Sequence, residues 1–170
     1  MRIHTAQLLK EPIGSTRHYK FQEIEQPSGI EGLSVVEGQV TLLKTDKGIF
    51  VRGEVETAAE GICSRCLKEV SIPLSFRFEE EFFPSIDIVT GAPLDSPEEH
   101  DLFTIDEHHI LDLTEAVRQY SIVHTPIQPL CRPDCAGLCT QCGADLNSGS
   151  CKCPQMVDPR WEPLARLKGR

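Results

Sequence analysis

The stretch that decides the fold is residues 131–153, CRPDCAGLCTQCGADLNSGSCKC, which hold six of the eight cysteines in the 170-residue chain. Their spacing is C-x3-C-x3-C-x2-C-x8-C-x-C, and the remaining two form a second close pair, Cys63-Ser-Arg-Cys66. A tetrahedral zinc ion binds four sulfurs that short loops bring together, and an x2 spacing lets both sulfurs of a pair reach one ion. Gly143 supplies the open backbone that such a turn needs. The spacing therefore predicts a zinc-binding module.

Two zinc ions with four thiolates each would use every cysteine. The favoured grouping joins Cys63 and Cys66 to Cys131 and Cys135, which ties the rim of a sheet to the chain after a helix. The second ion would then be held within a local ribbon. Its ligands would be Cys139, Cys142, Cys151 and Cys153. The alternative is a single ion held by C-terminal cysteines alone, with the first pair free; His124 is a reserve ligand.

Disulfides and thiol redox chemistry are the competing interpretations of the cysteines. The N-terminal MRIHTAQLLKEPIG has no apolar run of signal-peptide length, and no segment of the sequence is long enough to span a membrane. We therefore expect a cytoplasmic protein without membrane partners, in which thiols stay reduced and such patterns favour metal. A reactive C-x-x-C usually opens a helix, whereas strand-like segments flank Cys63 and Cys66.

The charge is unevenly distributed along the chain. The net charge of −9 argues against a protein that coats nucleic acid non-specifically. Residues 1–130 carry 11 Lys and Arg against 22 Asp and Glu, whereas residues 131–170 carry 6 against 4. We therefore expect any contact with an anion to be made by the cysteine-rich end.

The first 130 residues are expected to form a β-rich α+β domain. Residues 4–10 are compatible with a helix, and residues 17–25 alternate as in a strand. Two β-patterned runs flank Asp46-Lys47-Gly48 and predict a hairpin. Residues 68–80 alternate most clearly, with Pro73 indicating a free edge or a bulge. Cys63 and Cys66 lie in the turn before this last strand.

Residues 79–115 contain 12 acidic side chains and no Lys or Arg, which indicates a solvated loop or a docking segment for a basic partner. His108 and His109 in this loop are expected to face solvent. Helical spacing then runs from Ile110 to Val123, with Asp112 or Thr114 as possible N-caps. We expect this helix to cover an antiparallel β-meander sheet, and residues 131–170 to form a zinc-ribbon-like module with a C-terminal helix.

No catalytic motif accompanies the cysteines. The sequence contains no P-loop, dinucleotide-binding fingerprint, H-E-x-x-H motif or serine nucleophile elbow. Thiols held by zinc are poor nucleophiles, so we expect a protein that is not an enzyme and has no small-molecule substrate. A thiol redox protein or zinc redox sensor that uses Cys63 and Cys66 is the alternative.

Together these motifs resemble the YceD family of large ribosomal RNA subunit accumulation proteins. The resemblance rests on Cys63-Ser-Arg-Cys66-Leu67, on Thr125-Pro126-Ile127, on the run from Leu130 to Cys153, and on Asp158-Pro159-Arg160-Trp161. It implies a non-enzymatic factor that large-subunit ribosomal RNA needs in order to be processed or to accumulate. Ribosomal RNA and ribosomal proteins are then the expected partners, with the acidic loop as a possible site for basic ribosomal proteins.

The candidate RNA contacts are basic and aromatic residues near and after the last cysteine. Cationic side chains can contact phosphate, and a tryptophan can stack on an unpaired base. Alternatively, Trp161, Leu164 and Leu167 form one face of a short helix that docks on the domain. The candidates are Lys152, Arg160, Trp161, Arg166 and Lys168.

Overall fold

The computed structural model describes residues 1–25, 34–94, 103–154 and 160. The predicted C-terminal helix and three of the candidate RNA contacts, Trp161, Arg166 and Lys168, lie outside these residues. So does the middle of the predicted acidic loop, residues 95–102. No helix in the described part of the chain is long and apolar enough to cross a membrane.

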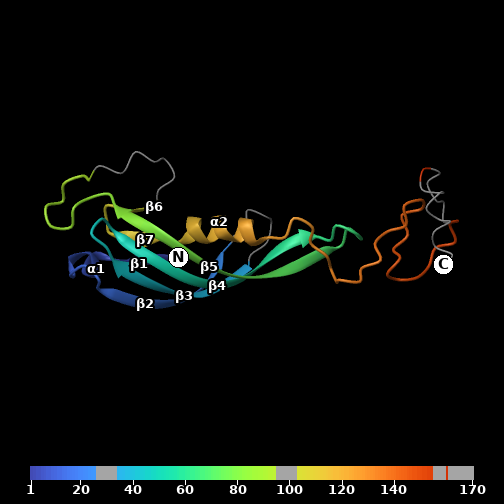
Figure 1. The fold of residues 1–170 in the computed structure, drawn as a ribbon, viewed down its shortest axis with the longest axis horizontal. Coiled ribbons are helices and arrows are strands. Elements are labelled where there is room, and N and C mark those ends of the chain that lie inside the picture. Colours follow the sequence, from blue (N-terminus) through green and yellow to red (C-terminus); the bar gives the residue numbers. More distant parts are fainter. Residues whose placement is uncertain (26–33, 95–102, 155–159, 161–170) are drawn as a thin grey trace.

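The described residues form a curled seven-stranded sheet with two helices and a cysteine-rich C-terminal segment (Figure 1). Along the sheet the strands lie in the order β1-β7-β6-β5-β4-β3-β2. In chain order the elements are β1 (Arg2–His4), α1 (Ala6–Lys10), β2 (Thr16–Glu25), β3 (Ser34–Lys44), β4 (Ile49–Ile62), β5 (Glu69–Pro84), β6 (Phe103–Ile105), β7 (Ile110–Asp112) and α2 (Thr114–His124).

The predicted α+β class fits, but the prediction of a purely antiparallel meander is wrong. Strands β2 to β5 do form an antiparallel meander with the predicted hairpin at residues 45–48. Strand β6, however, pairs in parallel with the end of β5, and β7 pairs with β1 at the far edge. The predicted acidic loop 79–115 thus contains the end of β5 and two short strands. Ile105 of β6 and Leu111 of β7 are fully buried, and the free energy of this burial outweighs the preference of the acidic residues for solvent.

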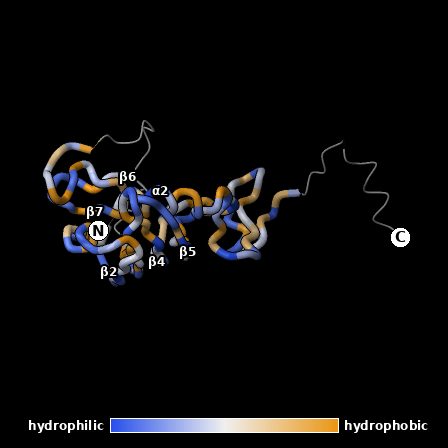
Figure 2. The backbone as a smooth tube through the Cα atoms, turned by 60° about the vertical axis from the view of Figure 1, so that its left-hand side comes forward, coloured by the Kyte–Doolittle hydropathy of each residue, from blue (hydrophilic) through white to orange (hydrophobic). Residues whose placement is uncertain are grey.

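The core lies on one face of the long strands, as their alternation predicted. Leu74, Phe76, Phe78 and Phe82 of β5 are buried, while their neighbours are exposed or half-buried. Bands of hydrophobic and hydrophilic residues accordingly alternate along the tube (Figure 2). Helix α2 packs on β5, where Tyr120 contacts the ring of Phe78 at a centroid distance of 5.6 Å. The expected two layers are therefore present.

Helix α2 begins later than its hydrophobic spacing predicted. Residues 110–112 are strand β7, because they pair with β1, and the helix starts at Thr114. One carboxylate oxygen of Asp112 accepts hydrogen bonds from the backbone N–H of Thr114, at 2.9 Å, and from its hydroxyl, at 2.6 Å. The N-cap position is therefore Leu113 and neither of the two predicted residues, but Asp112, which precedes it, satisfies an N–H at the start of the helix.

The β4–β5 hairpin extends beyond the rest of the sheet. Strand β3 pairs with β4 only as far as Glu56, whereas β4 and β5 remain paired to Ile62 and Glu69. We call this two-stranded extension, residues 57–74, the arm. Pro73 lies in it, at an edge of β5 that no other described strand pairs, as the sequence predicted. The arm carries Cys63 and Cys66 at its tip, next to the chain that follows α2 (Figure 1).

Candidate metal centres

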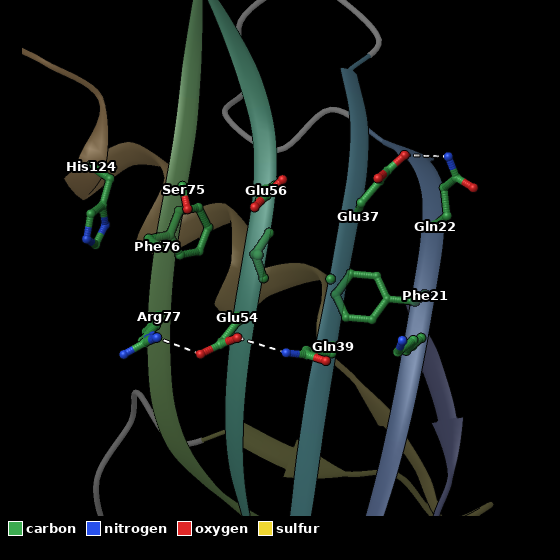
Figure 3. Close-up of a pocket in the computed structure, with 13 residues that line it drawn as sticks. Phe21, Gln22, Glu37, Gln39, Glu54, Glu56, Ser75, Phe76, Arg77 and His124 are labelled. Carbon is green, nitrogen blue, oxygen red and sulfur yellow. Dashed lines mark hydrogen bonds and ion pairs between the residues drawn. The ribbon is translucent and has the colours of Figure 1, made fainter.

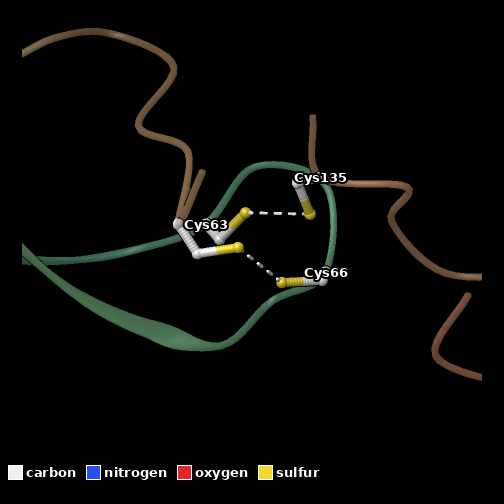
Figure 4. Close-up of side chains that lie close together, drawn as sticks. Cys63, Cys66 and Cys135 are labelled. Carbon is white, nitrogen blue, oxygen red and sulfur yellow. Dashed lines mark hydrogen bonds between the residues drawn. The ribbon is translucent and has the colours of Figure 1, made fainter. Parts of the chain in front are cut away.

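The first cysteine group, Cys63, Cys66, Cys131 and Cys135, joins the tip of the arm to the C-terminal segment. All four sulfurs lie within 4.8 Å of one another. The sulfurs of Cys63 and Cys135 are 3.8 Å apart, and those of Cys66 and Cys131 are 3.6 Å apart (Figure 4). A disulfide requires about 2.05 Å, whereas four sulfurs at 2.3 Å from a tetrahedral zinc ion lie about 3.8 Å from each other. The group therefore fits a metal ion and not a pair of disulfides.

The second cysteine group lies within the C-terminal segment alone. Cys139, Cys142, Cys151 and Cys153 also have all four sulfurs within 4.8 Å of one another. The structure thus brings the eight cysteines together in the two sets of four favoured from the spacing. The alternative with one ion and a free first pair is not the arrangement found, because the sulfurs of Cys131 and Cys135 lie beside those of Cys63 and Cys66.

The two C-x-x-C turns have the same backbone geometry. The N–H of Cys63 donates to the carbonyl of Lys68, and the N–H of Leu67 donates back to the carbonyl of Cys63. The second turn repeats both bonds, from Cys139 to Ala144 and from Gly143 to Cys139. The residue after the second cysteine has a positive φ in both turns, 58° at Leu67 and 71° at Gly143. Each turn therefore holds its two sulfurs on a preformed loop.

The thiol pKa values follow the same pattern in both groups. Backbone N–H groups of Cys66 and Cys131 lower the pKa of Cys63 to about 6. Those of Cys142 and Gln141 likewise lower the pKa of Cys139 to about 6. Hydrogen bonding to the neighbouring sulfur of Cys135, together with burial, raises the pKa of Cys131 to about 12. Because thiolates are the metal-binding form, these backbone N–H groups favour the metal-binding form of the first cysteine in each turn.

Bonds that do not involve sulfur also fasten the arm to the C-terminal segment. The N–H of Ser64 donates to the carbonyl of Pro129 at 2.8 Å, and the N–H of Leu138 donates to the carbonyl of Arg65 at 3.2 Å. The Arg65 guanidinium donates to the carbonyl of Cys135 at 2.8 Å. Lys68 forms an ion pair of 2.6 Å with Asp145, which lowers the pKa of that carboxyl to about 2. The first cysteine group therefore lies in a junction between the arm and the C-terminal segment, which these hydrogen bonds and this ion pair also hold together.

The side chain of Asn147 contacts the sulfur of Cys135 and so orients a ligand of the first group. Its side-chain oxygen accepts a bond of 2.8 Å from the N–H of Ala136, and its side-chain nitrogen approaches the sulfur of Cys135 at 3.5 Å. Such partners fix the orientation of a ligand. The sequence alone did not indicate that Asn147, Arg65 and Lys68 support the first cysteine group. The Asp145-x-Asn147 pair was a usable signal for Asn147, because these residues build local turns.

The two groups differ in burial. Cys63, Cys66 and Cys135 are buried, with Leu130 and Leu138 packed against them. In the second group Cys142 is exposed and the other three cysteines are half-buried. Cys131, the fourth cysteine of the first group, is exposed, so an ion there would be partly shielded from solvent and chelators, whereas one in the second group would be more accessible.

The remaining candidate residues do not join either group. His124 stacks on Phe76 at a centroid distance of 5.1 Å, and its Nδ1 lies 2.8 Å from the carbonyl of Tyr120. His108 is exposed and His109 half-buried. Lys152 and Arg160 are exposed, so their side chains are accessible to a partner.

Substituting Gly137 by alanine is expected to destabilise the junction by about 1–3 kcal/mol. Gly137 has a φ of 76°, which disfavours alanine, and an added Cβ would lie 3.0 Å from the carbonyl oxygen of Arg65. Gly91→Ala is the matched control, because Gly91 has a φ of 69° but nothing within 4 Å of its Cβ position. Urea unfolding of both variants measures the difference. Equal losses would show that the contact with Arg65 contributes nothing.

Comparison with known proteins identifies relatives for most of the chain. Residues 51–168 match the family model described as large ribosomal RNA subunit accumulation protein YceD. Uncharacterised proteins of Mycobacterium bovis and Mycobacterium tuberculosis are each 30% identical over 147 residues, which are 83% of this chain and 68% of theirs. One from Mycobacterium leprae is 26% identical over 120 residues, 70% of this chain and 52% of its own. No solved structure matches the chain.

Proposed function

The chain belongs to the YceD family, and on that premise we propose that it is a non-enzymatic factor that supports the processing or accumulation of large-subunit ribosomal RNA. The observation that carries the proposal is the extent of the family match. It runs from residue 51 to residue 168 and so includes both strands of the arm and all eight cysteines. The family match thus covers the part of the chain that holds the cysteine groups, which supports the proposal.

Two zinc ions are the proposed cofactors, one in each group. Tetrahedral sites with four sulfurs suit zinc, and the distances between sulfurs in the first group support this geometry. Such zinc would have a structural role, since four protein ligands leave no open position for a substrate. The function would then depend on the surface that the two ions hold in place.

The proposed partners are large-subunit ribosomal RNA and ribosomal proteins in the cytoplasm. The C-terminal segment is the proposed RNA contact, through Lys152, Arg160, Trp161, Arg166 and Lys168. The acidic segment after β5 is the proposed contact for basic ribosomal proteins. The excess of acidic residues before residue 131 supports binding to particular sites over general affinity for RNA.

A zinc redox sensor is the second candidate, because the pKa of Cys63 is lowered to about 6 and its sulfur lies among three other thiols. Thiolate character makes a cysteine susceptible to oxidation. In this case oxidation of the first group would release zinc and open the junction. The burial of Cys63 and Cys66 favours the structural role over this one.

The test is a sucrose-gradient profile of ribosomes, with ribosomal RNA lengths, from cells depleted of this protein. We expect mature large subunits to fall and wild-type protein to restore them. Cys135→Ser protein should fail to restore them, whereas Ser75→Ala protein, changed at an exposed position of β5, should succeed. A normal profile after depletion would overturn the assembly role. It would leave redox sensing to be tested by zinc release on exposure to hydrogen peroxide.

A further inference from the structure

Strand β2 is a long, regular strand at the edge of the sheet. It is last in the strand order and pairs with β3 in continuous one-to-one register from Thr16 to Glu25. No other strand in the described part of the chain pairs with it, although the N-terminal ammonium of Met1, next to β1, forms an ion pair of 3.0 Å with Glu23 of β2. Every second residue of β2 therefore turns its backbone N–H and C=O away from β3.

Of the usual protections of an exposed edge, β2 has charged side chains, such as Arg17 and Lys20, and lacks the others. Edge strands are otherwise commonly short, bulged, interrupted by proline or covered by a helix. This strand is 10 residues long, without a proline and without a bulge in its register. The ring of Phe21 does not cover the edge either, because it lies across Gly38, toward β3, where an added Cβ would approach it to 2.6 Å (Figure 3).

Hollows border this edge, and three of them meet at Lys20. One of about 480 Å³ lies between β2 and the opposite edge strand β1, and is lined by Ile3 and Leu113 among others. A hollow of about 1060 Å³ extends from residues 20–22 across the sheet to His124 (Figure 3). A third, of about 420 Å³, is lined by His18, Tyr19 and Lys20. All three include Lys20 in their lining.

From these features we infer that β2 binds an extended segment of a partner polypeptide, which adds to the sheet as a further strand. In this mode the main chain supplies the hydrogen bonds, and recesses for alternate side chains supply the specificity.

The lining defines the chemistry of the segment. The recess beside β1 is lined by Ile3, Phe21 and Leu113, which suit apolar side chains, and its polar lining includes Arg2, His4 and Glu23. Lys20 is exposed, and within the described residues it forms no ion pair. The neighbouring carboxylate of Glu54 is bound by Arg77 and Gln39 instead (Figure 3). The segment thus carries an Asp or Glu opposite Lys20, between apolar residues.

Strand β3 separates this edge from β4 and β5, whose extension is the arm, and the wider hollow reaches only the base of the arm, at Glu56 and Ser75. The inference therefore does not depend on the role proposed for the metal centres. Single-stranded RNA is the less suitable occupant, because the wider hollow is lined by Glu37, Glu54 and Glu56, which repel phosphate.

The test is selection of displayed random ten-residue peptides on the full zinc-loaded chain, followed by hydrogen exchange of the β2 amides. We expect selected peptides to alternate apolar residues with Asp or Glu. They should slow the exchange of alternate β2 amides, and Lys20→Glu should weaken their binding at least tenfold. Lys10→Glu, an exposed lysine on α1, is the matched control and should leave the affinity unchanged.

Three results would overturn the inference. The first is that no peptide is enriched, or that enriched peptides bind Lys20→Glu equally well and leave the β2 amides exchanging quickly. The second is slow exchange of alternate β2 amides in the chain without peptide. If this protection increases with protein concentration, a second copy of the chain covers β2; if it does not, a segment of the same chain covers it. The third is that RNA, added as a mixed-sequence ten-nucleotide oligomer, slows the exchange of these amides whereas the peptides do not.

Discussion

Replacing Cys135 by serine is expected to release one zinc ion and to separate the arm from the C-terminal segment. The Cys135 sulfur is buried, lies 3.8 Å from that of Cys63 and accepts a contact from Asn147. A structural zinc site contributes roughly 10–16 kcal/mol of apparent binding energy, and little apolar packing surrounds this one, with Leu130 and Leu138 the partly buried residues at its side. Loss of the ion should therefore unfold the junction while the sheet remains.

Hydrogen exchange measures this effect at the amides of Ser64 and Leu138, which bond across the junction. Both should exchange much faster in Cys135→Ser, while amides in the centre of β4 stay protected. Cys142→Ser is the control, because Cys142 belongs to the second group and is exposed. It should release the other ion and leave the two junction amides protected. Unchanged protection in Cys135→Ser would mean that the hydrogen bonds hold the junction without metal.

Replacing Phe78 by alanine is expected to destabilise the sheet domain by about 3–5 kcal/mol. The ring is buried, contacts Tyr120 of α2, and fills the space opposite Gly53, where an added Cβ would lie 2.2 Å from a ring atom. Its loss would leave a cavity between the helix and two strands. Urea unfolding measures the change in free energy.

The control for Phe78→Ala is Ser75→Ala, on the opposite face of the same strand. Ser75 is exposed, so its substitution should change the unfolding free energy by less than about 0.5 kcal/mol. Both variants should still bind two zinc ions, because the arm and the C-terminal segment are untouched. Equal destabilisation by the two substitutions would contradict the assignment of Phe78 to the core face.

The long antiparallel strands β3, β4 and β5 were predictable because their signals are local. Alternation along β4 and β5 marks the buried face of the sheet, and the turn residues between β3 and β4 mark the first reversal of the chain. Strands β1, β6 and β7 have three residues each, too few for a periodic signal. They form because distant segments pair, as when Arg2 lies opposite Asp112. Composition therefore suggested a continuous loop where the structure has short buried strands.

The cysteine groups were predictable for a related reason. Thiol spacing in the sequence restricts which sulfurs can meet, so the sets of four followed from pairs and loop lengths. The contacts that support the cysteine groups were not predictable in this way. Lys68 and Asp145 are 77 residues apart, and nothing near either of them in the sequence indicates the other. The same holds for Arg65, whose guanidinium reaches the carbonyl of Cys135 only after the arm has met the C-terminal segment.

The most direct test of the account is native mass spectrometry of the full chain purified under reducing conditions. We expect two zinc ions per chain, one in Cys135→Ser, one in Cys142→Ser and none when both substitutions are combined. A wild-type chain with a single ion would contradict the two-site arrangement. A metal-free chain whose mass shows disulfides would contradict the assignment of the cysteines to metal altogether.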